Sequence, residues 1–140
     1  MSVNVTALDQ VRELFSIASN DEVANNRLLS ITKDKDMINY PTLYGYNAAG
    51  TMLKANHAVW PMDKLNYFSE GKEQLEKVIE IYPQNVELRF IRYNIQKNSP
   101  GFLKYNQNLK RDSLFILTNI EKTGWSNNFK QKVKKSVKGI

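Results

Sequence analysis

Side chains suited to binding an anion lie along one face of a predicted helix over residues 85–98. Arg89, Arg92 and Gln96 follow one another at intervals of three and four residues, the spacing of neighbours on a helix surface. Two arginines three residues apart can hold a carboxylate or a phosphate through paired hydrogen bonds. The alternative is an internal network of ion pairs, for which the chain offers three carboxylates: Glu87, Asp112 and Asp63.

A second polar set lies on a predicted helix over 42–58. Asn47, Thr51 and Lys54 form a narrow polar stripe on a helix that is otherwise mostly apolar or small. His57, the single histidine, favours a half-buried, hydrogen-bonded side chain. General acid–base chemistry is the alternative, because histidine titrates near neutral pH. The candidate binding residues are therefore Asn47, Lys54, His57, Arg89, Arg92 and Gln96.

Several kinds of chemistry are excluded by residue type. The chain has no cysteine, which rules out disulfides, thiolate metal sites and cysteine nucleophiles. One histidine cannot build a site with several histidine ligands, and no glycine-rich phosphate loop or nucleophile-elbow motif occurs. The carboxylates of the predicted helix over 64–82 occupy its solvent side: Glu70, Glu73, Glu76 and Glu80. We expect no catalysis, no metal and no cofactor.

The first elements that must support these sets form a helical hairpin. Thr6 precedes Asp9 and Ser19 precedes Glu22, and each pair has the spacing of a helix-start capping box. Because a hydroxyl and a carboxylate three residues apart satisfy backbone donors, we predict helix starts at both places.

The two central helices are bounded by prolines. Apolar and small residues through Val59 surround the helix over 42–58, a pattern typical of a buried helix, and Pro61 ends it. Asp63 can cap the next helix, over 64–82. Its apolar stripe begins at Leu65, and Pro83 stops it.

The helix over 85–98 carries two apolar strips, which predicts that it lies between two layers. Leu88, Ile91 and Ile95 form one strip, and the other consists of Val86, Phe90 and Tyr93. After it, a short turn is predicted to plug the core with Phe102, Leu103 and Tyr105. A helix over 107–122 then buries Leu109, Leu114 or Phe115, Ile116, Leu117 and Ile120.

These patterns predict an all-α fold of antiparallel helical hairpins. No run alternates with period two for long enough to suggest a strand. With 140 residues and 41% hydrophobic residues, the chain has the size and composition of a single helical domain over 1–140.

The net charge of +6 is concentrated at the C-terminal end of the chain. Residues 123–140 contain five lysines and no acidic residue, so the rest of the chain is nearly neutral. The basic terminal helix over 125–138 either docks through Phe129, Val133 and Val137 or lies on an anionic membrane surface. Nucleic acid is not expected as a partner, because lysine without arginine lacks bidentate base readout.

The compartment is predicted from the N-terminus. No basic segment followed by an apolar stretch begins the chain, which predicts a cytoplasmic protein for the chain as given, or an exported one if a leader was removed.

Two resemblances bear on the fold. The stretch from Leu65 to Glu87 resembles the second helix and exit turn of a tetratricopeptide repeat, with Gly71, Leu75, Val78 and Pro83 at the family's positions. The Trp60-Pro61 break and the absence of a 34-residue period depart from that pattern.

A longer stretch, from Tyr44 to about Leu117, is similar to an uncharacterised family of small bacterial all-helical proteins. Its pattern includes Lys54-Ala-Asn-His-Ala and Pro83-Gln-Asn-Val-Glu-Leu-Arg-Phe-Ile-Arg. The resemblances imply a tetratricopeptide-like helical stack and no known activity. We therefore expect a non-enzymatic protein-interaction or adaptor module that holds a protein or peptide beside the third and fifth helices. Membrane-surface or polyanion binding through the lysine-rich terminal helix is the alternative.

Overall fold

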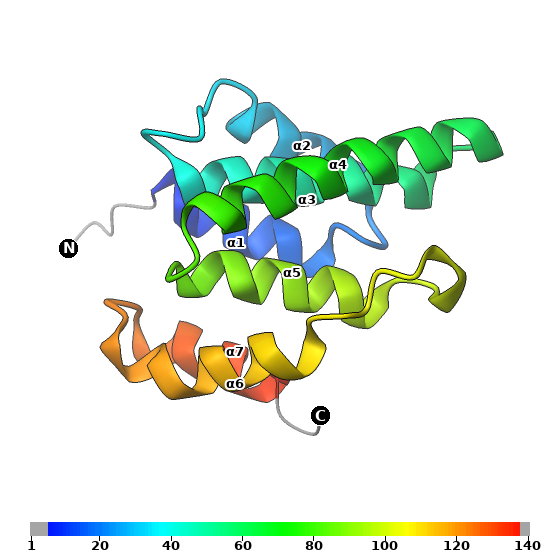
Figure 1. The fold of residues 1–140 in the computed structure, drawn as a ribbon. Helices are drawn as coiled ribbons and strands as arrows, with labels where there is room; N and C mark the ends of the chain where they lie inside the picture. Colours follow the sequence, from blue (N-terminus) through cyan, green and yellow to red (C-terminus); the bar gives the residue numbers. More distant parts are fainter. Residues whose placement is uncertain (1–5, 138–140) are drawn as a thin grey trace. The chain divides into compact units, whose positions relative to one another are not determined.

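The fold is all-α, as the periodicity predicts. The computed structural model describes residues 6–137, none of which forms a β-strand. Seven α-helices and two short 3-10 helices follow one another along this part of the chain (Figure 1). Their bounds are α1 (Ala7–Ile17), α2 (Glu22–Thr32), α3 (Pro41–His57), α4 (Pro61–Ile81), α5 (Val86–Asn98), η1 (Gly101–Leu103), α6 (Leu109–Asn119), η2 (Ile120–Lys122) and α7 (Asn127–Val137).

The residue contacts fall into two compact units. The N-terminal unit, Met1–Ile81, contains α1 to α4, and the C-terminal unit, Tyr82–Ile140, contains α5 to α7. The sequence predicts a single domain over 1–140, and the division falls between Ile81 and Tyr82, one residue before Pro83. A proline cannot continue a helix without losing a backbone hydrogen bond, so α4 ends there.

Of the two predicted capping boxes, the one at the start of α1 is present and the one at the start of α2 is not. Thr6 and Asp9 form a complete capping box at the start of α1, as predicted. Hydrogen bonds donated to the Asp9 carboxylate by the Thr6 hydroxyl and by the Thr6 backbone lower the pKa of Asp9. The predicted cap at Ser19 is wrong, because the side chain of Asp21 accepts the hydrogen bond from the Ala24 backbone at the start of α2. Aspartate directly before the first helical turn caps as well as serine does.

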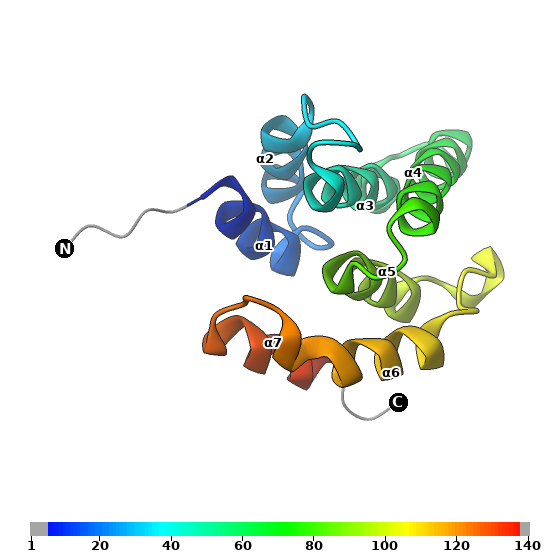
Figure 2. The ribbon, with the colours of Figure 1, turned by 60° about the vertical axis from the view of Figure 1, so that its left-hand side comes forward.

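In the N-terminal unit, α3 packs against both α2 and α4 (Figure 2). The helix predicted to be buried does bury its small residues, which are Gly45, Ala48, Ala49 and Gly50. Across from them, Gly71 lies so close to α3 that an added Cβ would meet the Met52 Cγ at 2.3 Å and the Ala48 carbonyl oxygen at 2.5 Å. The backbones of α3 and α4 therefore approach closely at Gly71.

At the turn between α3 and α4, three sequence predictions are wrong: the helix cap at Asp63 and the burial of Val59 and Leu65. Pro61 is the first residue of α4, where its missing N–H costs nothing, so Asp63 lies inside the first turn instead of before it. Val59 and Leu65 are exposed by 81% and 51%. Val59 lies in the connection between the helices, and Leu65 lies at the edge of the α4 stripe.

In the C-terminal unit, α5, α6 and α7 share one apolar cluster. Phe90, Tyr93, Ile116, Ile120, Val133 and Val137 form its buried part. Trp125 and Phe129 pack against it, and the ring of Phe129 meets that of Phe90 edge-on with centroids 6.2 Å apart. The terminal helix is therefore docked through its apolar face. Lys138, the last residue predicted for that helix, lies outside the described residues.

The segment between α5 and α6 plugs the core with one residue instead of three. Tyr105 is 2% exposed, whereas Phe102 is 78% exposed and Leu103 is half-buried. Lys104 adopts a left-handed conformation with a φ of 54°. The chain turns at this residue, so Tyr105 enters the core and Phe102 does not.

The structure also decides between the alternatives for α6. Leu114 is 68% exposed and Leu117 is 43% exposed, so neither is part of the core. Phe115 is half-buried, and the fully buried side chains of this helix are Asp112 and Ile116. Of the alternatives Leu114 and Phe115, Phe115 is therefore the more buried, and the predicted burial of Leu117 is wrong. Among the described residues, no helix has the length and apolar character needed to cross a membrane.

The contact at Gly71 gives a test of the α3–α4 packing. We expect Gly71→Ala to lower the free energy of unfolding by roughly 1–3 kcal/mol, because overpacking a close helix contact outweighs the gain in helix propensity. Urea unfolding measures this. Gly124→Ala is the matched control, since an added Cβ there meets nothing within 4 Å. Equal stability of the two variants would contradict the close approach.

Candidate functional site

The predicted arginine pair surrounds a buried carboxylate in the C-terminal unit. Asp112, on α6, is fully buried. Arg92, on α5, donates from Nε to Asp112 Oδ2 and from Nη2 to Oδ1, both at 2.7 Å. Arg89 Nη1 adds a third hydrogen bond to Oδ1 at 3.1 Å. Of the alternatives left open by the sequence, the internal ion-pair network with Asp112 is present.

Gln96 and Asn108 extend this polar contact between α5 and the chain leading into α6. The Gln96 amide nitrogen donates to Asn108 Oδ1 at 2.9 Å, and Gln96 Oε1 accepts from the Asn108 backbone at 3.0 Å. Gln96 is 2% exposed. Since the amide is satisfied at both ends and buried, this predicted binding residue holds the start of α6 in position.

Arg89 differs from Arg92 because it also reaches the surface. Its Nε donates to the Pro83 carbonyl at 3.2 Å, and its guanidinium stacks on the ring of Phe115 with 4.4 Å between the Cζ atom and the ring centroid. The stack fixes the Phe115 ring against α5. A guanidinium over an aromatic face is favourable, and Arg is the cation found most often in this arrangement.

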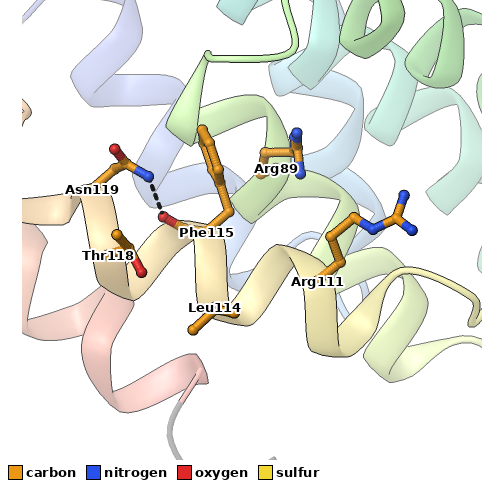
Figure 3. Close-up of a pocket in the computed structure, with 6 residues that line it drawn as sticks. All are labelled: Arg89, Arg111, Leu114, Phe115, Thr118 and Asn119. Carbon is orange, nitrogen blue, oxygen red and sulfur yellow. Dashed lines mark hydrogen bonds between the residues drawn. The ribbon is translucent and has the colours of Figure 1, made fainter.

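These contacts form one side of an open pocket of about 320 Å³ between α5 and α6. Arg89 from α5 and the ring of Phe115 from α6 lie side by side in Figure 3, while the guanidinium of Arg111 extends away from α6. The other lining residues are Leu114, Thr118 and Asn119. Asn119 donates from its side chain to the Phe115 carbonyl at 2.8 Å. The lining is largely apolar, and its size suits one or two side chains.

The other predicted binding residues lie in the N-terminal unit and have partners there. Asn47 donates to the Thr32 hydroxyl at 2.9 Å, and the Lys54 ammonium lies 4.9 Å from the ring centroid of Tyr67. His57 is half-buried, and its Nε2 lies 3.1 Å from the Ala18 carbonyl oxygen. The half-buried, hydrogen-bonded histidine predicted from the sequence is confirmed.

The two predicted sets therefore occupy different units. Asn47, Lys54 and His57 belong to the N-terminal unit, whereas Arg89, Arg92 and Gln96 belong to the C-terminal unit. The pocket at Arg89 takes its remaining lining residues from α6. Four of these lining residues are not among the binding residues predicted from the sequence: Arg111, Leu114, Phe115 and Thr118. Their spacing of three, four and seven residues could have indicated a common helix face.

Two further ionisable groups of the C-terminal unit, Glu121 and Tyr93, have shifted pKa values. Lys134 and Lys130 hold Glu121, at 2.7 Å and 3.7 Å, and the hydrogen bond from Lys134 lowers the pKa of that carboxyl. Burial raises the pKa of Tyr93, whose hydroxyl has no hydrogen-bond partner among the described residues. No group of three or more His, Asp or Glu side chains that could hold a metal lies within residues 6–137.

Comparisons with known proteins add no relative. No protein-family model matches the chain, and neither a curated protein nor a solved structure matches it.

The Asp112 network predicts a large difference between two carboxylates that each contact two cations. We expect Asp112→Ala to lower the free energy of unfolding by roughly 3–5 kcal/mol, because it leaves two guanidinium groups near α6 without their buried counter-ion. Glu121→Ala removes an exposed carboxylate and changes stability far less. Urea unfolding measures the free energy of unfolding of both variants. A similar loss of stability in both would contradict the larger contribution expected from the buried ion pairs.

Proposed function

We propose that this protein is a non-enzymatic protein-interaction module that takes an apolar side chain of a peptide partner into the α5–α6 pocket. The observation that carries the proposal is the pocket itself. In its largely apolar wall, the guanidinium of Arg89 stacks on the ring of Phe115. A wall that is already ordered loses little entropy on binding, which favours a small apolar anchor.

The surroundings of the pocket support a docking role. Leu114, at its edge, is 68% exposed, and Leu117, one turn further along α6, is 43% exposed. Exposed leucines scattered singly are ordinary on protein surfaces, but two on one helix face beside a pocket form an apolar contact area. A peptide could bury both leucines while its anchor occupies the pocket.

Filling the pocket should weaken such binding. Thr118→Trp places an indole in the pocket from an exposed position, and Gln131→Trp adds the same group on the exposed side of α7. We expect peptides selected on the wild-type protein from a displayed random library to share an apolar residue. They should bind Thr118→Trp about tenfold more weakly or worse, and Gln131→Trp as tightly as the wild type.

Two outcomes would contradict the proposal. One is a library that yields no enriched peptide. The other is a set of enriched peptides that bind Thr118→Trp with unchanged affinity, as measured by fluorescence anisotropy.

A second candidate function is electrostatic attachment to an anionic membrane surface through α7. Lys132 and Lys135 support it, since both are exposed and their side chains make no ion pair with the described residues. Phe129, Val133 and Val137 are engaged in the apolar cluster, so this attachment would depend on charge and not on insertion.

The salt dependence of vesicle binding tests this second candidate. We expect co-sedimentation with phosphatidylserine vesicles at low salt and its loss at high salt, because the Debye length shrinks. The double variant Lys132→Glu/Lys135→Glu should not co-sediment. Binding that persists in the double variant would exclude α7 as the attachment site.

A further inference from the structure

The two units carry opposite formal charges. Residues 82–140 contain twelve lysine and arginine side chains against three carboxylates, a formal charge of +9. Residues 1–81 contain eight basic and eleven acidic side chains, a formal charge of −3. The basic character of the protein therefore belongs to the whole C-terminal unit and not to the tail alone.

The few carboxylates of this unit are already engaged or buried. Asp112 is held by two arginines and Glu121 by two lysines. Glu87 is 4% exposed. Six exposed basic side chains make no ion pair or hydrogen bond with the described residues: Lys104, Lys110, Arg111, Lys122, Lys132 and Lys135. Over residues 82–137, the surface of the unit thus has unpaired positive charge and no exposed carboxylate without a cationic partner.

Two of these cations lie beside the apolar area of α6. Lys110, Leu114 and Leu117 follow one another at intervals of four and three residues, so they share the outward face of the helix. Arg111 is on the pocket side of that face, together with Thr118. The outward face of α6 therefore combines two exposed leucines, a pocket and two unpaired cations.

We propose that the segment bound at this face is an acidic amphipathic helix of a partner protein. This inference rests on the proposed function and names the chemistry of the partner. Its apolar stripe would cover Leu114 and Leu117 and place one side chain in the pocket, the helix-in-groove mode of recognition. Its carboxylates would pair with Lys110 and Arg111. Arg111 can hold a carboxylate with two parallel hydrogen bonds.

The pocket favours a protein segment over a lipid surface at this place. A bilayer presents no discrete side chain that would fill a concave site of about 320 Å³. The positive charge favours an acidic segment over a basic one, because like charges brought together at an interface are repelled. Complementary charge would also speed association at low salt.

Two synthetic peptides with the same leucine stripe test the inference. One carries glutamates at its polar positions, and the other carries lysines there. We expect the glutamate peptide to bind the wild-type protein with an affinity that falls as salt is added, and the lysine peptide not to bind. Lys110→Glu/Arg111→Glu should weaken the glutamate peptide by about tenfold or more.

A charge-matched control separates this face from general attraction to the unit. Lys132→Glu/Lys135→Glu makes the same change of charge on α7 and should weaken the glutamate peptide by less than about threefold. Equal loss in both double variants would overturn the assignment to α6. Circular dichroism and urea unfolding establish that both variants fold, since all four side chains are exposed.

The remaining outcomes separate the two proposals. If peptides selected from the library bind in the pocket but the glutamate peptide does not, the acidic-helix inference fails and the proposed function stands. If the lysine peptide binds as well as the glutamate peptide, the inference also fails, because the charge of the peptide would not be recognised. If no peptide of any charge binds and Thr118→Trp changes nothing, both fail.

Discussion

The buried carboxylate of Asp112 is the constraint on which the C-terminal unit depends. A fully buried carboxylate is strongly unfavourable unless cations and hydrogen bonds compensate it, and Arg92 and Arg89 provide three hydrogen bonds. Because all three come from α5, the pairing fixes the register of α5 against α6. A shift by one helical turn would break the two-bond pairing of Arg92 with Asp112. Gln96 and Asn108 fix the same two segments at a second point.

This network also shapes the surface beside it. Arg89 contacts Asp112, the Pro83 carbonyl and the ring of Phe115, so one guanidinium connects the interior of the unit to the wall of the pocket. The arginines predicted to bind a ligand are therefore occupied by the fold. Arg111, one turn before Phe115 on α6, has no such partner and faces outward. The paired arginines and the exposed, unpaired Arg111 thus lie close together in the same unit.

The excess of positive charge extends over the whole C-terminal unit and is not confined to the C-terminal end of the chain. The sequence locates the excess of lysine in residues 123–140, and that excess is real. The division into units shows that the same +9 also includes cations on α6 and in the preceding turn. Repulsion among the excess cations destabilises the folded unit, and burial of its apolar core offsets this repulsion. Helix α7 contributes to that core through Phe129, Val133 and Val137.

The sequence by itself determined the features that arise within one or two helical turns. The all-helical fold, the Thr6–Asp9 capping box, the small-residue face of α3 and the apolar face of α7 could all be predicted, because each depends on neighbours a few residues apart. Only the tertiary structure decided that Arg92 pairs with Asp112, a carboxylate 20 positions further along the chain. It also decided that Leu114 faces solvent while Phe115 contacts Arg89. These outcomes depend on how one helix is rotated and shifted against another. Periodicity within a single helix carries no information about that relation when several of its faces are apolar.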